Sequence, residues 1–354
     1  MEQANYTIKD LLGTAIEKGA SDLHITVGVP PLMKVRGEFE HIGDRNLGPD
    51  DTRALVRELF EDEESFNQFL SVGDKDFSLS ISRLGRFRVN TFIQRGSLAA
   101  AIRVVFTELP DPKELLIPDA VLRMHQLNKG LVLVTGPTGS GKSTTLACII
   151  DLINSTRKCH ILTLEEPIEF LHRHKMSVVN QREIGEDTQS YARALRAALR
   201  ESPDVILVGE MRDLETISIA LTAAETGHLV LSTLHTLGAA KTIDRIIDVF
   251  PPNQQHQVRV QLSTVLKAVI SQQLIPSEKK GQVAAFEIMI MNNAIQNLIR
   301  ENKTYQIDSV IHSSRNLGMQ SMDMSISELY KQGYITREDA LLYSLNPDVL
   351  AKYL

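Results

Sequence analysis

The sequence predicts an α/β protein with two domains of different kinds. Up to about residue 106, strand-like segments alternate apolar and polar residues, whereas beyond residue 120 short all-apolar segments alternate with helical ones. Alternation is typical of an antiparallel sheet with one face in water, and all-apolar strands are typical of a parallel sheet covered on both faces. Prolines at 110, 112 and 118 prevent a continuous helix between these regions. We therefore expect a first domain at 1–106, a linker at 107–119 and a second domain at 120–354.

The first domain is expected to be a small antiparallel sheet with helices. Residues 7–19 and 49–60 have helical periodicity. Strands are predicted at 22–27, within 31–42, and at 76–81, 86–93 and 98–106. Gly73, Gly85 and Gly96 supply the turns among the last three strands.

The second domain is expected to hold a parallel sheet followed by helices. All-apolar strands are predicted at 131–136, 159–166, 204–210 and 228–235. From about residue 238 the pattern becomes mainly helical, with a long helix at 255–275 and a helical C-terminal region from about 275. The last three strands each end in polar residues, and in open α/β sheets the ligand crevice lies at the carboxyl ends of the strands. These polar residues are therefore expected to meet at one site.

The composition fits a cytoplasmic protein without a nucleic-acid partner. Lys and Arg total 38 against 44 Asp and Glu, so the overall charge gives no reason to expect binding to nucleic acid or to an anionic membrane. We expect no membrane insertion, because no basic-then-apolar signal and no run of about 18 apolar residues occurs. Cys148 and Cys159 form no CxxC pair, which argues against a disulfide framework or a zinc site.

A glycine-rich loop between an apolar strand and a helical segment indicates a nucleotide phosphate site. Gly136, four further residues, Gly141, Lys142 and Ser143 have the P-loop spacing. Glycines let backbone amides turn toward the phosphates, the lysine brings positive charge to the β- and γ-oxygens, and the serine hydroxyl suits Mg²⁺. An ordinary glycine-rich turn is the alternative. The predicted ligands are ATP and Mg²⁺, and the predicted binding residues are Gly136, Pro137, Thr138, Gly139, Ser140, Gly141, Lys142, Ser143 and Thr144.

Glu210 ends the apolar strand at 204–210, which is the arrangement of a Walker B carboxylate. There it can polarise the attacking water or hold Mg²⁺ through its hydration shell. The alternative is a carboxylate that only caps the N-terminus of the next helix. Asp204 lies at the other end of this strand and is expected to be structural.

An acidic cluster lies beyond the strand at 159–166. Glu165, Glu166 and Glu169 surround Pro167 in this segment. Their position after a strand end suits the orientation of water or metal, whereas acidic loops elsewhere are commonly only solvated. Both interpretations remain open.

Two histidines bracket the strand LVLST. His228 and His235 are seven residues apart, so an unbroken strand cannot point both to one face. His235, at the carboxyl end, is expected to sense the γ-phosphate. His228 enters the strand from the opposite end and is expected to bond either to the backbone or to a neighbouring subunit.

Four segments, in order, resemble the four characteristic boxes of the type II/IV secretion and pilus ATPases. They are GPTGSGKST, LTLEEPIEF, VILVGEMRD and TGHLVLSTLHT. The resemblance extends over most of the chain, because GASDLHI, RFRVNTFIQRG and SRNLGMQSMD are also similar to segments of this family. Within the family, AIQNLIREN at Ala294–Asn302 is similar to the AIRNLIRE signature of PilT-type retraction motors.

This resemblance implies a ring-shaped homohexamer. Each subunit would have a PAS-like N-terminal domain and a RecA-like P-loop ATPase domain with a helical C-terminal region, joined by a flexible linker, with ATP between the domains. N-terminal arginines reach the phosphates in these ATPases, although those of this chain can also be solvated strand residues. The family's catalytic glutamate falls on Glu210, its acidic-box glutamates on Glu165 and Glu169, its histidines on His228 and His235, and its arginines on Arg88 and Arg103. With the P-loop residues added, the predicted catalytic residues are Glu210, Lys142, Glu165, Glu169, His235, Arg88 and Arg103. His228 is predicted to bind the nucleotide, and Ser143 and Glu210 the metal.

The implied function is ATP hydrolysis that drives type IV pilus retraction and twitching motility. The motor would lie at the cytoplasmic face of the inner membrane, with a platform protein of the pilus machine as partner through Ala294–Asn302. The same segment fits an ordinary amphipathic helix with Ile295, Leu298 and Ile299 facing inward. The chain departs from the family pattern at Glu166, where Asp is common, and at Gln296, where the retraction signature has Arg.

Three alternatives are open. An assembly or secretion ATPase of the same superfamily usually has an extra N-terminal domain and a four-cysteine motif, neither of which this chain shows. A DNA translocase would show basic loops with interleaved aromatics. A non-hydrolysing, nucleotide-gated scaffold is disfavoured by the intact Lys142, Ser143 and Glu210.

Overall fold

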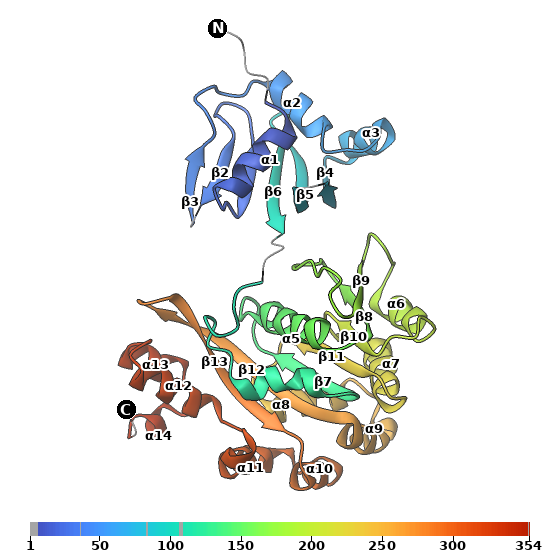
Figure 1. The fold of residues 1–354 in the computed structure, drawn as a ribbon, viewed down its shortest axis with the longest axis vertical. Helices are drawn as coiled ribbons and strands as arrows, with labels where there is room; N and C mark the ends of the chain where they lie inside the picture. Colours follow the sequence, from blue (N-terminus) through green and yellow to red (C-terminus); the bar gives the residue numbers. More distant parts are fainter. Residues whose placement is uncertain (1–5, 36, 83, 106–108, 353) are drawn as a thin grey trace. The chain divides into compact units, whose positions relative to one another are not determined.

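The computed structural model describes residues 6–35, 37–82, 84–105, 109–352 and 354. It divides into two compact units, Met1–Thr107 and Glu108–Leu354. Each unit has its own sheet (Figure 1). Each also has its own buried core. Among the residues that the structure describes, no helix combines the length and the apolar character needed to cross a membrane.

In its described residues, the first unit has a six-stranded antiparallel sheet and three helices. The strand order is β3-β2-β1-β6-β5-β4, as the alternating sequence pattern predicts. One face is covered by the helices around a core that includes Leu12, Phe69, Phe87 and Ile102. The elements are α1 Ile8–Glu17, β1 Asp22–Ile25, β2 Leu32–Val35, β3 Glu38–His41, α2 Pro49–Arg57, α3 Glu63–Val72, β4 Asp74–Ile81, β5 Gly85–Gln94 and β6 Ser97–Val105.

The second unit contains a seven-stranded sheet in the order β13-β12-β7-β11-β10-β8-β9. All neighbours in this sheet are parallel except β12 and β13. The predicted α/β class is therefore confirmed. The strands are β7 Gly130–Thr135, β8 His160–Glu165, β9 Val178–Glu183, β10 Val205–Val208, β11 Leu229–Leu234, β12 Leu266–Ser277 and β13 Gly281–Ile290.

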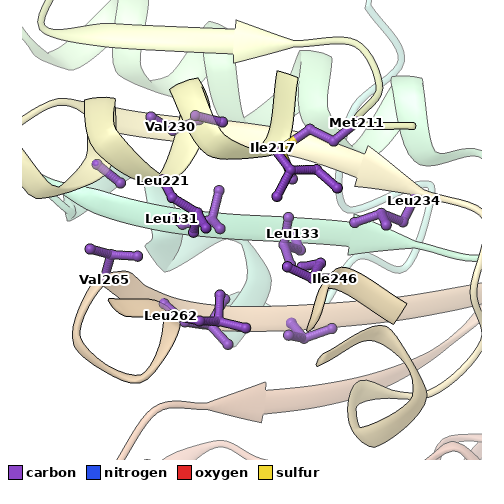
Figure 2. Packing of buried hydrophobic residues seen from close by; sticks show 14 of the residues in the cluster. Leu131, Leu133, Met211, Ile217, Leu221, Val230, Leu234, Ile246, Leu262 and Val265 are labelled. Atoms are coloured by element: carbon purple, nitrogen blue, oxygen red, sulfur yellow. The ribbon is translucent and has the colours of Figure 1, made fainter. Parts of the chain in front are cut away.

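Helices cover both faces of this sheet, and successive residues of β7 therefore pack into two different cores. Leu131 and Leu133 pack with α7 (Leu214–Glu225), α8 (Ala239–Asp248) and α9 (Pro252–Val265), as Figure 2 shows. Val132 and Val134 pack with α5 (Lys142–Thr156) on the other face. All four side chains are fully buried. The helices are α4 Asp119–Leu122, η1 Arg123–Gln126, α5 Lys142–Thr156, α6 Tyr191–Ala198, α7 Leu214–Glu225, α8 Ala239–Asp248, α9 Pro252–Val265, α10 Asn293–Arg300, η2 Thr304–Gln306, α11 Ile307–Ser313, η3 Arg315–Leu317, α12 Met322–Lys331, α13 Arg337–Tyr343 and α14 Pro347–Leu350.

The predicted long helix at 255–275 is wrong in its second half. Helix α9 ends at Val265, and Leu266 begins β12, which pairs with both β7 and β13. The prediction fails because a strand buried on both faces has no period-2 pattern to distinguish it from a buried helix. The predicted helical region from about 275 is wrong for the same reason up to Ile290, and helices resume only at Asn293.

Two further elements were not expected from the sequence. Helix α3 follows a capping side chain, because the Asp62 carboxylate accepts a hydrogen bond from Ser65 N–H at 2.7 Å. Strand β9 forms the edge of the second sheet, beside β8. The predicted linker at 107–119 remains a prediction: residues 107 and 108 lie outside the described residues, and Ile117 already belongs to the core of the second unit.

Leu133→Ala is expected to lower the free energy of unfolding of the second unit by about 2–5 kcal/mol, because Leu133 is fully buried in β7 and the change leaves a cavity. Chemical denaturation of the full chain measures this loss. The control is Leu342→Ala at a side chain that is 74% exposed, for which we expect a change within about 0.5 kcal/mol. Equal effects of the two substitutions would contradict the assigned core.

Candidate functional site

A cavity of about 470 Å³ opens at the carboxyl edge of the parallel sheet in the second unit. It is bounded by the glycine loop after β7 and by the ends of β8, β10 and β11, which are the four segments that the sequence singles out. Parallel pairing brings these ends to one edge. The lining residues are Thr138, Gly139, Ser140, Gly141, Lys142, Ser143, Thr144, Glu165, Glu166, Pro167, Glu169, Tyr191, Gly209, Glu210, Arg212, Thr233 and His235.

The glycine loop takes a path that side chains would block. Gly136 has φ 144° and packs against β12, so that a Cβ there would lie 2.1 Å from the carbonyl oxygen of Gln272. Gly141 has φ 84° and is the N-cap of α5. The loop therefore ends at the amino end of a 15-residue helix, whose free amides and dipole favour an anion.

Lys142 is held inside this loop. Its Nζ donates hydrogen bonds to the carbonyl oxygens of Gly136 at 2.8 Å and Pro137 at 2.9 Å. Burial lowers the pKa of Lys142 from its ordinary value, and the Glu169 carboxylate acts in the opposite direction. The ammonium group is thus enclosed beside the cavity, where negative phosphate oxygens would stabilise its charge.

Glu165 ends β8 and points into a hydrogen-bonded corner of the cavity. Its Oε1 accepts from Thr163 Oγ1 at 2.6 Å and from Gln181 Nε2 at 3.2 Å. Burial raises the pKa of the Glu165 carboxyl to about 7, outweighing the hydrogen bonds from Thr163 and Gln181, which lower it. Glu166 and Glu169 are exposed at the rim. Within the acidic cluster, Glu165 is the partly buried carboxyl, and its raised pKa lets it exchange a proton near neutral pH.

Glu210 and His235 face each other across the ends of β10 and β11. The distance from His235 Nε2 to Glu210 Oε2 is 3.3 Å, and Arg212 forms an ion pair with the other carboxylate oxygen. Burial lowers the pKa of His235, as do the charges of Lys142 and Arg212, so the ring is neutral at neutral pH. Two bonds from β11 fix the end of β10: Ser232 Oγ donates to Val208 O and Thr233 Oγ1 to Gly209 O.

The alternative of a capping role for Glu210 is wrong. Helix α7 begins at Leu214, and its N-cap is Asp213, whose carboxylate accepts from Thr216 N–H at 2.8 Å. Asp204 is structural, as expected, because its carboxylate accepts from His160 N–H at 2.8 Å at the start of β8.

His228 is not part of this pocket. It precedes β11 at the opposite edge of the sheet, where its Nδ1 lies 3.0 Å from the carbonyl oxygen of Ala223. The backbone-bonding interpretation therefore accounts for its place in this chain. Its assignment to nucleotide binding gains no support from the second unit and stays a prediction about a neighbouring subunit.

Arg88 and Arg103 lie in the first unit. They are directly opposite each other on β5 and β6, and both are exposed. Arg103 Nε donates to Asp22 Oδ1 at 2.9 Å. Two cations in opposed positions of an antiparallel pair repel each other, and Asp22 compensates the charge of Arg103.

Three residues at or behind the pocket were not predicted. Tyr191 reaches the cavity from the start of α6, and burial and the nearby Glu166 and Glu165 raise the pKa of its hydroxyl, so it stays protonated. Arg212 forms an ion pair with Glu210. It follows Glu210 by two residues in the sequence, but hydrophobic periodicity does not predict where a polar side chain after a strand end will point. Gln272 touches the loop from β12, which was predicted as helix.

The chain matches known proteins over nearly its whole length. The family model "Type II/IV secretion system protein" matches residues 2–342. The Type IV pilus retractation ATPase PilT of Pseudomonas aeruginosa is 49% identical over 335 residues, covering 94% of this chain and 96% of that protein. The Twitching motility protein of Neisseria gonorrhoeae is 46% identical over 350 residues, covering 98% and 92%. The crystal structure of the pilus retraction motor PilT with bound ADP superposes with a TM-score of 0.90 at 50% identity, covering 98% and 99%.

A P-loop at the carboxyl edge of a parallel sheet, beside a strand-end carboxylate, defines the class of this protein as a P-loop ATPase. The match over residues 2–342 identifies the particular group: the chain belongs to the type II/IV secretion system protein family. The predicted family and the predicted enzyme class are therefore confirmed.

Gly136→Ala is expected to abolish nucleotide binding, because the new Cβ would lie 2.1 Å from a backbone oxygen of β12 and the loop must move. Binding of a fluorescent ADP analogue measures the loss. Gly185→Ala is the matched control: its φ of 94° imposes similar backbone strain, but nothing lies within 4 Å of its Cβ and it is outside the pocket. We expect that control to lose about 1 kcal/mol of stability and to keep its affinity.

We expect the free energy of unfolding of Glu165→Gln to increase relative to that of the wild type as pH rises from about 4.5 to about 7. A carboxyl whose pKa is higher in the folded than in the unfolded state binds more protons when folded, so wild-type stability falls with pH across that window. Urea denaturation of both proteins at several pH values measures the difference. A stability difference that does not vary with pH would show that the carboxyl is not enclosed as described.

Proposed function

We propose that this chain is the subunit of a hexameric motor that hydrolyses ATP to drive type IV pilus retraction. The observation that carries the proposal is the convergence of Lys142, Glu210 and Glu165 on one cavity at the P-loop. The relatives named for pilus retraction and twitching motility support the cellular role, because they align over at least 92% of this chain's own length and of theirs.

Lys142 and the amides of the loop bind the phosphates in this mechanism. The hydrogen bonds of Nζ to Gly136 and Pro137 hold the ammonium at the mouth of the loop, where it can exchange carbonyl partners for β- and γ-oxygens. Ser143 and Glu210 both line the cavity and are the residues that would hold Mg²⁺. Two protein ligands are enough for Mg²⁺, because this ion takes most of its ligands from water and phosphate oxygens. Bound with ATP, Mg²⁺ supplies charge neutralisation at the γ-phosphoryl group.

Glu210 orients and activates the attacking water. Its carboxylate is held between His235 and Arg212 at the end of β10, so its direction is fixed. Neutral His235 can donate one hydrogen bond, either to Glu210 or to a γ-phosphate oxygen, and so respond to the presence of that phosphate. Glu165, with its pKa of about 7, and Glu169 at the rim complete the acidic side of the site.

Arg88 and Arg103 are proposed to stabilise the charge that spreads over the γ-phosphoryl oxygens. A planar guanidinium suits this purpose because it matches phosphate geometry with two donors. Both side chains are exposed on one face of the first sheet and are available to a phosphate when the two domains of a ring close. In a ring, closure of one subunit interface would open another, and this movement would convert ATP hydrolysis into mechanical work.

The partner surface is proposed at Ala294–Asn302. Ile295 and Ile299 are fully buried against the second unit, so the inward-facing interpretation of α10 holds for them. Gln296 is half-buried, Arg300 donates from Nε to Ser263 Oγ at 2.9 Å, and Glu301 pairs with Lys303. The polar side of this helix remains available to a platform protein at the cytoplasmic face of the inner membrane.

Two other functions are separable by observation. An assembly or secretion ATPase of the same superfamily would share the pocket, but the two free cysteines of this chain cannot supply a four-cysteine zinc motif. A non-hydrolysing scaffold would bind ATP without turnover, which the intact Lys142 and Glu210 disfavour.

Glu210→Gln is expected to abolish Mg-ATP turnover while ATP binding survives, because the amide keeps the shape of the side chain but cannot accept the water's proton. Turnover, ATP affinity and mass by light scattering are measured on the same purified samples. We expect a hexamer in both proteins and a loss of kcat of about 10²-fold or more.

Unchanged turnover in this variant would remove Glu210 from its role. A wild-type monomer that binds ATP without hydrolysis would favour the scaffold. Hydrolysis by a hexamer leaves retraction itself to a cellular test, in which cells carrying Glu210→Gln should assemble pili but fail to retract them.

A further inference from the structure

Strand β12 runs beside β7 up to the start of the P-loop, and three consecutive polar residues are buried there. Ser271, Gln272 and Gln273 are 0%, 1% and 8% exposed. Ser271 Oγ accepts from Gly238 N–H at 2.8 Å, and Gln273 Nε2 donates to the carbonyl of Tyr343 at 2.8 Å. A buried amide side chain is unfavourable unless its polar atoms are bonded, so the partners of Gln272 define what it does.

Gln272 is bonded at both ends of its amide group. Its Nε2 donates to the carbonyl oxygen of Ser140 at 2.5 Å, and its Oε1 accepts from Thr145 Oγ1 at 2.8 Å. Its backbone carbonyl packs against Gly136. A single residue of β12 therefore contacts the beginning of the P-loop, its last turn and the first turn of α5.

The bond to Ser140 sets the direction of the next backbone amide. A peptide is planar and trans, so the C=O of Ser140 and the N–H of Gly141 point in opposite directions. Because the carbonyl is held toward β12, the Gly141 N–H points away from β12. Gly141 lines the cavity and precedes the first turn of α5, where backbone amides bind phosphate oxygens.

We propose that Gln272 is a positioning residue of the nucleotide site. Through Ser140 it holds the Gly141 amide toward the phosphates, and through Thr145 it fixes its own orientation and the start of α5. It acts without touching the nucleotide. When its donor is lost the Ser140–Gly141 peptide can rotate, and nucleotide binding must then restore the loop. The inference rests on the nucleotide-binding function proposed for this loop.

The first test compares two buried glutamines of one strand. Gln272→Met removes both bonds to the loop and helix, whereas Gln273→Met removes a bond to the carbonyl of Tyr343 at α13. Calorimetric titration of the full chain with Mg-ADP is expected to show affinity about tenfold weaker or more for Gln272→Met. Gln273→Met should keep wild-type affinity and kcat. Both variants should show lower melting temperatures without nucleotide, because each loses a buried hydrogen bond.

The second test uses a substitution of almost the same shape. In Gln272→Glu an ionised carboxylate faces the Ser140 carbonyl and repels it, whereas the protonated form can donate to it again. Burial raises the pKa of such a carboxyl, so protonation falls within an accessible range. The affinity deficit relative to wild type is expected to shrink between pH 8 and pH 6. Gln273→Glu, measured alongside, should show no deficit at either pH.

The outcomes separate the inference from the function on which it rests. Wild-type affinity in both Gln272 variants would overturn the positioning role and leave the nucleotide site intact. A wild-type chain that does not bind Mg-ADP would overturn the proposed function instead. If Gln272→Met does not fold, the pH dependence of Gln272→Glu decides, and a deficit independent of pH would contradict the inference.

Discussion

The parallel register of β7, β11, β10 and β8 is the constraint on which the site depends. Leu234 pairs with Thr135, Ser232 with Val208, and Val208 with Leu164, so these strands end at nearly the same level. Neighbouring strands can change register only by whole residues, and a shift of one residue would turn each side chain of a strand to the other face of the sheet. Backbone pairing therefore places the loop, the acids and the histidine at one edge of the sheet.

The pKa values of the ionisable side chains in the pocket are set mainly by their burial, which removes water from around them. Burial lowers the pKa of Lys142, raises that of Glu165 and lowers that of His235, so each shift disfavours the charged form. A polyphosphate changes this balance unequally. It stabilises the Lys142 ammonium and raises the pKa of Glu165 further, because the first is of opposite charge and the second of like charge. Nucleotide occupancy and the protonation of this site are thus expected to be linked.

Much of the fold and site could be predicted from local signals. The P-loop spacing, Glu210 after an apolar strand and His235 after another are each readable within about ten residues, and the structure brings all of them to one cavity. The failures share a physical origin. The segment from Leu266 to Ser277 is apolar enough for a buried helix or a buried strand, and only its two sheet neighbours decide. Gln272 was missed with it.

The sequence by itself determined the phosphate loop, the strands β7, β8, β10 and β11, and the residues that can carry charge at their ends, because glycine spacing and hydrophobic runs are local properties. Tertiary structure alone decided which side chains meet. It places His228 at the far edge of the sheet, and it places Tyr191 and Arg212 in the pocket. It also brings Gln272 into contact with Ser140, which is 132 positions away in the chain. Contacts across such separations depend on sheet order, which no local pattern encodes.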